Sequence, residues 1–96
     1  MLLADVVFAE CVYVLESFYE VERQRVAELM RAALALPSIK TVDRASLLRA
    51  LEVYEVDRLD FAEAYLVAQA EGTGVDTILT FDRSVDRVTT VRRQEP

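Results

Sequence analysis

The chain reads Asp60-Phe61-Ala62-Glu63-Ala64-Tyr65-Leu66-Val67-Ala68-Gln69-Ala70 and, after a short loop, Thr77-Ile78-Leu79-Thr80-Phe81-Asp82-Arg83. The first run predicts a helix whose two acids, three residues apart, project from one face near its N-terminus. The second run predicts a short strand that ends on an acid. If the helix packs on the strand, Asp60, Glu63 and Asp82 meet at one edge of a sheet, and several carboxylates together suit a hard divalent cation.

The rest of the chain predicts three more helices and two more strands. Apolar spacing indicates helices over residues 6–18, 21–36 and 43–54, with Asp5 and Asp43 as N-caps and Pro37 as a stop. Residues 39–42 and 89–92 read as short strands, and residues 82–84 as a turn before a short helix. A strand between helices predicts crossover connections and a parallel sheet, so the expected class is helix-rich α/β.

The predicted helix over residues 6–18 holds an acid that local structure does not explain. Its apolar residues cover nearly the whole circumference, which is typical of a buried helix. Glu10 lies among them on a narrow stripe with Tyr13 and Ser17, where neither a cap nor a turn accounts for a carboxylate. We therefore expect Glu10 to have a partner or a cation.

The other acids each have a structural interpretation beside the functional one. Asp60 and Glu63 have the spacing of a capping box, in which the first acid accepts from the N3 amide and the second reaches back to the N-cap amide. Asp82 follows a strand, where an aspartate commonly opens a turn. Both interpretations stay open at this level.

Composition restricts the chemistry that the chain can perform. Its 96 residues, 53% apolar, predict one small globular domain over residues 1–96. Cys11 is the single cysteine and there is no histidine, which excludes an internal disulfide, a Cys/His zinc site and a histidine general base. No apolar run approaches a membrane span, so we expect a cytoplasmic protein without a membrane partner.

The charged residues give a mixed prediction for nucleic acid. The net charge of −6 argues against loose, charge-driven binding to nucleic acid, although acids that hold a cation are compatible with phosphate. Four arginines follow Asp82 and predict either a basic rim that binds substrate or a charged tail: Arg83, Arg87, Arg92 and Arg93. Arg83 and Arg87, nearest to Asp82, are the candidate substrate-binding residues.

Together these segments resemble the PIN-domain family, in particular the VapC-type toxins of bacterial and archaeal toxin–antitoxin pairs. Residues 5–16 look like the family's helix that carries a glutamate, Asp60 to Ala64 like its Asp-Phe-Ala-Asp-Ala segment, and Thr80 to Arg83 like its Thr-Phe-Asp strand end. Each fragment is weak alone. Three fragments in the right order, spread over almost the whole chain, form a more specific signal.

The resemblance implies a PIN-like sandwich of a mostly parallel sheet with flanking helices, and a ribonuclease that hydrolyses RNA with Mg²⁺ or Mn²⁺. By position, Glu10 and Asp82 match metal-binding and catalytic acids of the family. Glu63 stands where the family usually has aspartate, so Asp60 and Glu63 are both kept as ligands. The implied partners are RNA, a VapB-type antitoxin and a second copy of the chain.

The front of the chain departs from the family pattern. Family members begin with a strand that ends in Asp-Thr-Asn, then a helix, before the segment that starts here at Leu2. We therefore expect an incomplete domain that lacks the first strand and helix, has impaired cleavage, and dimerises through residues 6–18 or rearranges its strands. The alternatives are a non-catalytic remnant that dimerises or binds an antitoxin peptide in a groove, and a small acidic helical domain whose acids are caps.

Overall fold

The computed structural model describes residues 1–96, which form four α-helices and one small sheet. The elements are, in order, α1 (Asp5–Ser17), α2 (Arg23–Leu34), α3 (Arg44–Glu52), the π-helix η1 (Val53–Asp57), α4 (Phe61–Thr73), β1 (Thr77–Leu79), the 3₁₀-helix η2 (Arg83–Arg87) and β2 (Arg92–Gln94). The four predicted helices are confirmed, with ends that differ by a few residues. None of them combines the length and the apolarity that crossing a lipid bilayer requires.

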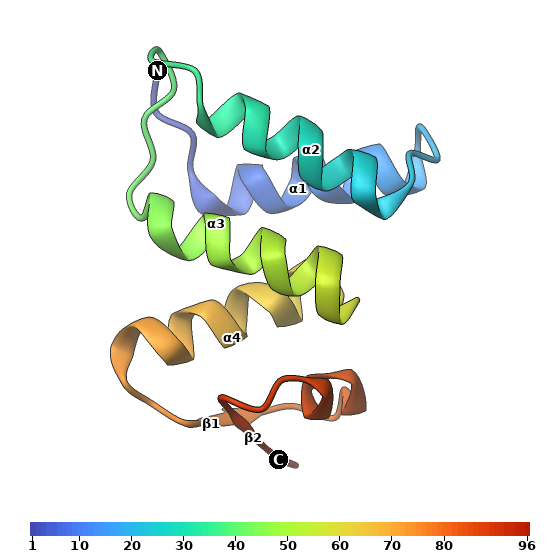
Figure 1. The fold of residues 1–96 in the computed structure, drawn as a ribbon, viewed down its shortest axis with the longest axis vertical. Coiled ribbons are helices and arrows are strands. Elements are labelled where there is room, and N and C mark those ends of the chain that lie inside the picture. Colours follow the sequence, from blue (N-terminus) through green and yellow to red (C-terminus); the bar gives the residue numbers. More distant parts are fainter.

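From α2 onward the helices follow one another along the longest axis of the molecule, and α1 lies beside α2 (Figure 1). Figure 1 shows α1 and α2 at one end, followed by α3, then α4, with β1, η2 and β2 at the other end. The largest contact joins α3 to α4, and α1 touches both α2 and α4. The C-terminal unit of β1, η2 and β2 therefore meets the helices through α4.

Parallel strand pairing, as predicted, is present in two separate places. β1 and β2 pair in parallel, with Thr77 opposite Arg92 and Leu79 opposite Gln94. A parallel bridge between Leu2 and Lys40 lies near the N-terminus, at the opposite end of the molecule (Figure 1). The α/β class is confirmed, but the sheet has two strands. The strand predicted at 39–42 is reduced to this bridge because only Lys40 pairs: its amide donates to the Met1 carbonyl and its carbonyl accepts from the Leu3 amide.

Local capping signals set the ends of two helices. The carboxylate of Asp43 accepts from the Ser46 amide at 3.1 Å and from its hydroxyl at 2.7 Å, so the predicted cap of α3 is confirmed. Gly74 follows α4 in the left-handed region at φ 76°, as in a helix C-cap that favours glycine. These two caps fix where α3 begins and where α4 ends.

A cluster of aromatic rings lies at the centre of the core. Phe8 of α1 packs on Phe61 of α4 with ring centroids 5.4 Å apart, and Tyr54 of η1 meets Phe61 at 6.1 Å. Phe8 and Tyr54 are fully buried. The start of α4, which carries Asp60 and Glu63, is thereby packed against both α1 and the end of α3.

The prediction of a fully buried first helix is wrong. Only Phe8 and Val12 of α1 are buried, whereas Val6 is 65%, Tyr13 68% and the adjoining Phe18 81% exposed. The reason is that α2, α4 and the Tyr54 side chain of η1 cover one side of α1 and leave the other side exposed. Asp5 is also not the N-cap: Ala4 takes that position, and the Asp5 carboxylate accepts from the Tyr65 hydroxyl at 2.5 Å.

Candidate metal centre

Asp60 lies at the N-cap position of α4 but does not cap it. Its side chain accepts no hydrogen bond from the helix, so the predicted capping box does not form. The side chain is exposed, beside a hollow of about 320 Å³ that α1 and the start of α4 enclose. The Asp60 carboxylate is therefore available for another ligand.

Glu63, in the first turn of α4, has a carboxyl group whose pKa is raised. Burial raises its pKa, and the charges of Asp82 and Asp60 add to the rise, while the Thr80 hydroxyl acts in the opposite sense. Its Oε2 atom is buried without a hydrogen-bond partner. Glu63 thus lies within electrostatic range of the two other acids and has one oxygen that nothing in the chain satisfies.

Asp82 is the N-cap of η2, which confirms the interpretation that this aspartate opens a turn. Its Oδ1 accepts from the Ser84 amide at 2.9 Å, and its own amide donates to the Thr80 hydroxyl at 3.0 Å. The hydrogen bonds of Ser84 hold the pKa of Asp82 below its usual value, and the charges of Arg87 and Arg93 lower it further. Asp82 is therefore an anion at neutral pH, held at a fixed place beside Glu63.

Glu10 lies apart from these acids. Its side chain is exposed and lines an apolar groove between α1 and α2 with residues such as Val7, Val14 and Met30. It is not among the groups that shift the pKa of Glu63 or Asp82. No group of three or more His, Cys, Asp or Glu side chains has the spacing that a metal ion needs.

The three acids around Glu63 nevertheless have the chemistry that a hard cation requires. All their ligand atoms are carboxylate oxygens, and the Glu63 Oε2 atom is buried without a partner. Burial is the main cause of the raised pKa of Glu63, and the like charges of Asp82 and Asp60, which are unfavourable without a counter-ion, add to it. The residues fit Mg²⁺ or Mn²⁺ by donor type, with Asp60, Glu63 and Asp82 as the ones that would hold it.

The family of the chain follows from a match to the PIN domain over residues 1–91. The chain belongs to the PIN-domain family. Comparison with curated proteins and with solved structures gives no significant match. PIN domains are nuclease-type domains and generally use divalent metal ions, and the carboxylates around Glu63 are the residues of this PIN domain that suit such an ion.

The arginines predicted as a substrate rim of this PIN domain have different environments. Arg83, directly after Asp82, is exposed. Arg93 pairs with Asp86 at 3.3 Å and with Glu95 at 3.1 Å, and Arg92 lies exposed in β2. Arg87 donates to backbone carbonyls of Asp57 and Arg58. Arg83 is therefore the arginine of the set that lies beside an acid of the centre with its own side chain unengaged.

Sequence reasoning missed two residues that shape the surroundings of the centre. Glu16 of α1 accepts from the fully buried Tyr54 hydroxyl at 2.6 Å and shares the hollow with Asp60. Arg23 of α2 stacks over the Tyr54 ring, 4.3 Å from its centroid. Glu16 could have been singled out as a second acid in the apolar run of α1. Arg23 carries no signal in the sequence, because its partners are more than 30 residues away.

Proposed function

We propose that the chain is a VapC-type ribonuclease toxin domain that cleaves RNA with a divalent metal ion, Mg²⁺ or Mn²⁺. Asp60, Glu63 and Asp82 hold the ion, and Glu10, which lies apart from them on α1, is not assigned to the ligand set. The observation that carries the proposal is the environment of Glu63: its Oε2 atom is buried without a partner, and its carboxylate lies within electrostatic range of Asp60 and Asp82. A cation is the ligand that resolves both the repulsion and the missing partner.

Different residues of the site contact the metal ion and the RNA phosphodiester. When bound, the ion supplies a Lewis acid and an activated water. Glu63 and Asp82 hold that ion where α4 meets η2, and Asp60 binds it from the N-cap position of α4. Arg83, exposed directly after Asp82, contacts the RNA phosphate, where a guanidinium offers two parallel donors.

Direct binding of Mn²⁺ tests the proposal most sharply. We expect calorimetric titration of the wild-type chain to show Mn²⁺ binding, and Asp82→Asn to weaken it by at least about tenfold. Asp86→Asn is the matched control, because Asp86 is exposed, lies four residues further along and pairs with Arg93. Cleavage of a labelled RNA under the same conditions should follow the same order of variants. Equal Mn²⁺ binding by wild type and Asp82→Asn would contradict the assignment.

A second candidate function is a non-catalytic interaction module, favoured by the uncovered face of α1. Five apolar residues of the α1 region are exposed along this face: Val6, Val7, Tyr13, Val14 and Phe18. A large apolar helix face is typical of a surface that binds a partner, here a second copy of the chain or an antitoxin helix.

Oligomeric state checks this second function. If the α1 face joins two copies, sedimentation should show a dimer for the wild type and a monomer for Tyr13→Glu. Val75→Glu, at a residue that is 54% exposed in the loop between α4 and β1, is the control and should stay dimeric. A monomeric wild type that also binds no antitoxin peptide would leave the interaction module without support.

A further inference from the structure

Two arginines from distant elements hold the turn before α4. Arg23 of α2 donates from Nη1 to the carbonyls of Tyr54, at 2.8 Å, and Leu59, at 2.6 Å. Arg87, the last residue of η2, donates from Nη1 to the carbonyls of Asp57, at 3.3 Å, and Arg58, at 3.2 Å. The last carbonyls of a helix lack intrahelical partners, so the two guanidinium groups satisfy acceptors that would otherwise need water.

This turn determines where α4 begins. The π-helix η1 ends at Asp57, and Arg58 then takes the left-handed region at φ 62°, which is uncommon for a residue other than glycine. Asp60 follows two residues later as an N-cap whose side chain does no capping. The positions of Asp60 and Glu63 therefore depend on a backbone conformation that the capping of α4 does not stabilise.

Arg87 lies in η2, the short helix that begins directly after Asp82. Asp82 is the N-cap of η2, Val85 in its middle is fully buried, and Arg87 is its last residue. The helix is closed by backbone hydrogen bonds from Val85 to Asp82 and from Val88 to Val85. One end of η2 thus carries an acid of the candidate centre, and the other end is bonded to the backbone just before Asp60.

We propose that Arg87 is a positioning residue that fixes the separation of Asp82 from Asp60 and Glu63, while Arg23 holds the same turn against the core. This inference rests on the proposed function, in which the three carboxylates share a cation. It assigns Arg87 a role different from that of Arg83, because the Nη1 atom of Arg87 is already bonded to two carbonyls.

Arg87 acts on cation binding in two ways, as a tether that holds the turn before α4 and as a positive charge, and the two predict opposite effects. Arg87 and Arg93 both lower the pKa of Asp82 through their positive charge, after the hydrogen bonds of Ser84. Through charge alone, replacing either arginine by methionine would strengthen the binding of a cation, because a repulsive charge is lost. Loss of the tether would weaken binding, because the carboxylates would no longer be held at one separation. Arg93 pairs with Asp86 and Glu95 instead of the turn, so it is the matched control.

The experiment measures Mn²⁺ binding by calorimetry and amide hydrogen exchange over residues 58–63 in wild type, Arg87→Met and Arg93→Met. We expect Arg87→Met to weaken Mn²⁺ binding by about tenfold or more and to accelerate exchange in this segment. Arg93→Met should bind Mn²⁺ at least as tightly as wild type and exchange at the wild-type rate. A purely structural role for Arg87 would lower the melting temperature without this local pattern of exchange.

The two readouts separate failure of the inference from failure of the proposed function. If the wild type binds no Mn²⁺, the proposed function fails, and faster exchange over residues 58–63 in Arg87→Met alone still supports the tether. Exchange in Arg87→Met that equals the wild-type rate overturns the inference. Mn²⁺ binding by Arg87→Met that is as tight as that of Arg93→Met also overturns it, because charge would then account for everything that Arg87 does.

Discussion

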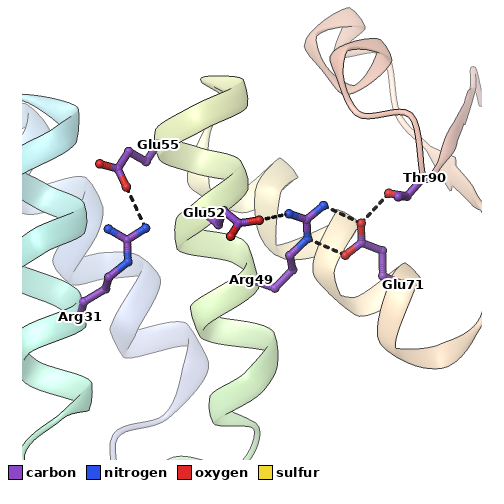
Figure 2. A network of polar contacts seen from close by, with 6 residues as sticks. All are labelled: Arg31, Arg49, Glu52, Glu55, Glu71 and Thr90. Atoms are coloured by element: carbon purple, nitrogen blue, oxygen red, sulfur yellow. Dashed lines mark hydrogen bonds and ion pairs between the residues drawn. The ribbon is translucent and has the colours of Figure 1, made fainter.

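Arg49 of α3 and Glu71 of α4 face each other as a two-pronged ion pair, with Nε to Oε1 at 2.7 Å and Nη2 to Oε2 at 2.9 Å. Figure 2 shows that Glu52 lies on the other side of the same guanidinium and that Thr90 reaches Glu71 from the loop before β2. A separate pair joins Arg31 to Glu55 at 2.7 Å. The Arg49 network therefore connects α3, α4 and the C-terminal unit, and the two side chains at its centre, Arg49 and Glu71, are only partly exposed.

Removal of the Arg49 guanidinium should destabilise the fold. Arg49→Met leaves the Glu71 carboxylate without its charged partner, and we expect a loss of about 1–2 kcal/mol after allowing for solvent screening. Arg25→Met is the control, because its pair with Glu28 is well exposed on both sides and should contribute close to nothing. Urea unfolding midpoints at constant m-value measure both variants, and equal midpoints would contradict the prediction.

The same ion pair predicts how stability changes in acid. The hydrogen bonds of Arg49 hold the pKa of Glu71 below its ordinary value of 4.5. A carboxyl whose folded pKa is lowered contributes stability that is present above 4.5 and is lost as the pH falls through the folded pKa. Wild type should therefore exceed Glu71→Gln in melting temperature at pH 6, and the difference should shrink steadily below pH 4.5. A difference that does not depend on pH would show that packing, and not charge, is responsible.

Replacing each of two glycines near the end of α4 by alanine should change the stability of the fold in opposite directions. Gly72 lies inside the helix, and an added Cβ would meet only the Ser46 hydroxyl at an ordinary 3.7 Å, so Gly72→Ala should stabilise the chain by about 0.5–1 kcal/mol. Gly74 is in the left-handed region at φ 76°, so Gly74→Ala should destabilise it by about 1 kcal/mol. Thermal unfolding of both variants tests the pair, and shifts of the same sign would contradict the C-cap geometry.

The buried Tyr54 hydroxyl should contribute through its bond to Glu16. Burial raises the pKa of Tyr54, so the hydroxyl stays protonated and donates at neutral pH. Tyr54→Phe preserves the ring between Phe61 and Arg23 but removes the donor, and we expect a loss of about 1 kcal/mol. Tyr19→Phe, at a tyrosine that is 67% exposed, is the control with an expected effect near zero. Equal midpoints of chemical unfolding would mean that the hydroxyl contributes nothing.

Signals confined to a few residues were predictable from the sequence. Asp43 and Gly74 mark helix ends because a cap depends on the neighbouring three or four residues, and the parallel pairing near Asp82 follows from the order of elements. The exposed face of α1 was not predictable, because apolar residues on every side of a helix do not reveal which side lacks a neighbour. The left-handed Arg58 gives no signal, since most residues with positive φ are glycine or asparagine.

The candidate centre was predictable only in part, because tertiary packing as well as spacing along the chain decides which of its residues lie together. Asp60 and Glu63 lie at the start of one helix, so their proximity follows from spacing, and Asp82 lies shortly after the strand that follows that helix. The position of Glu10 depends on how α1 rotates against α2 and α4, which is a matter of tertiary packing. Arg87 could be noticed as a charge near Asp82, but its bonds to carbonyls 29 and 30 residues away are invisible in the sequence.

From α2 onward the helices follow one another along one axis, which has a consequence for how the chain folds (Figure 1). α3 contacts α2, and α4 makes its largest contact with α3, so helices that are neighbours in the chain are also neighbours in space. Few long loops have to close before packing begins, so folding can advance with synthesis from the N-terminus. Asp82 follows α4 in the chain, and the acids of the candidate centre therefore come together only when the C-terminal unit packs on α4.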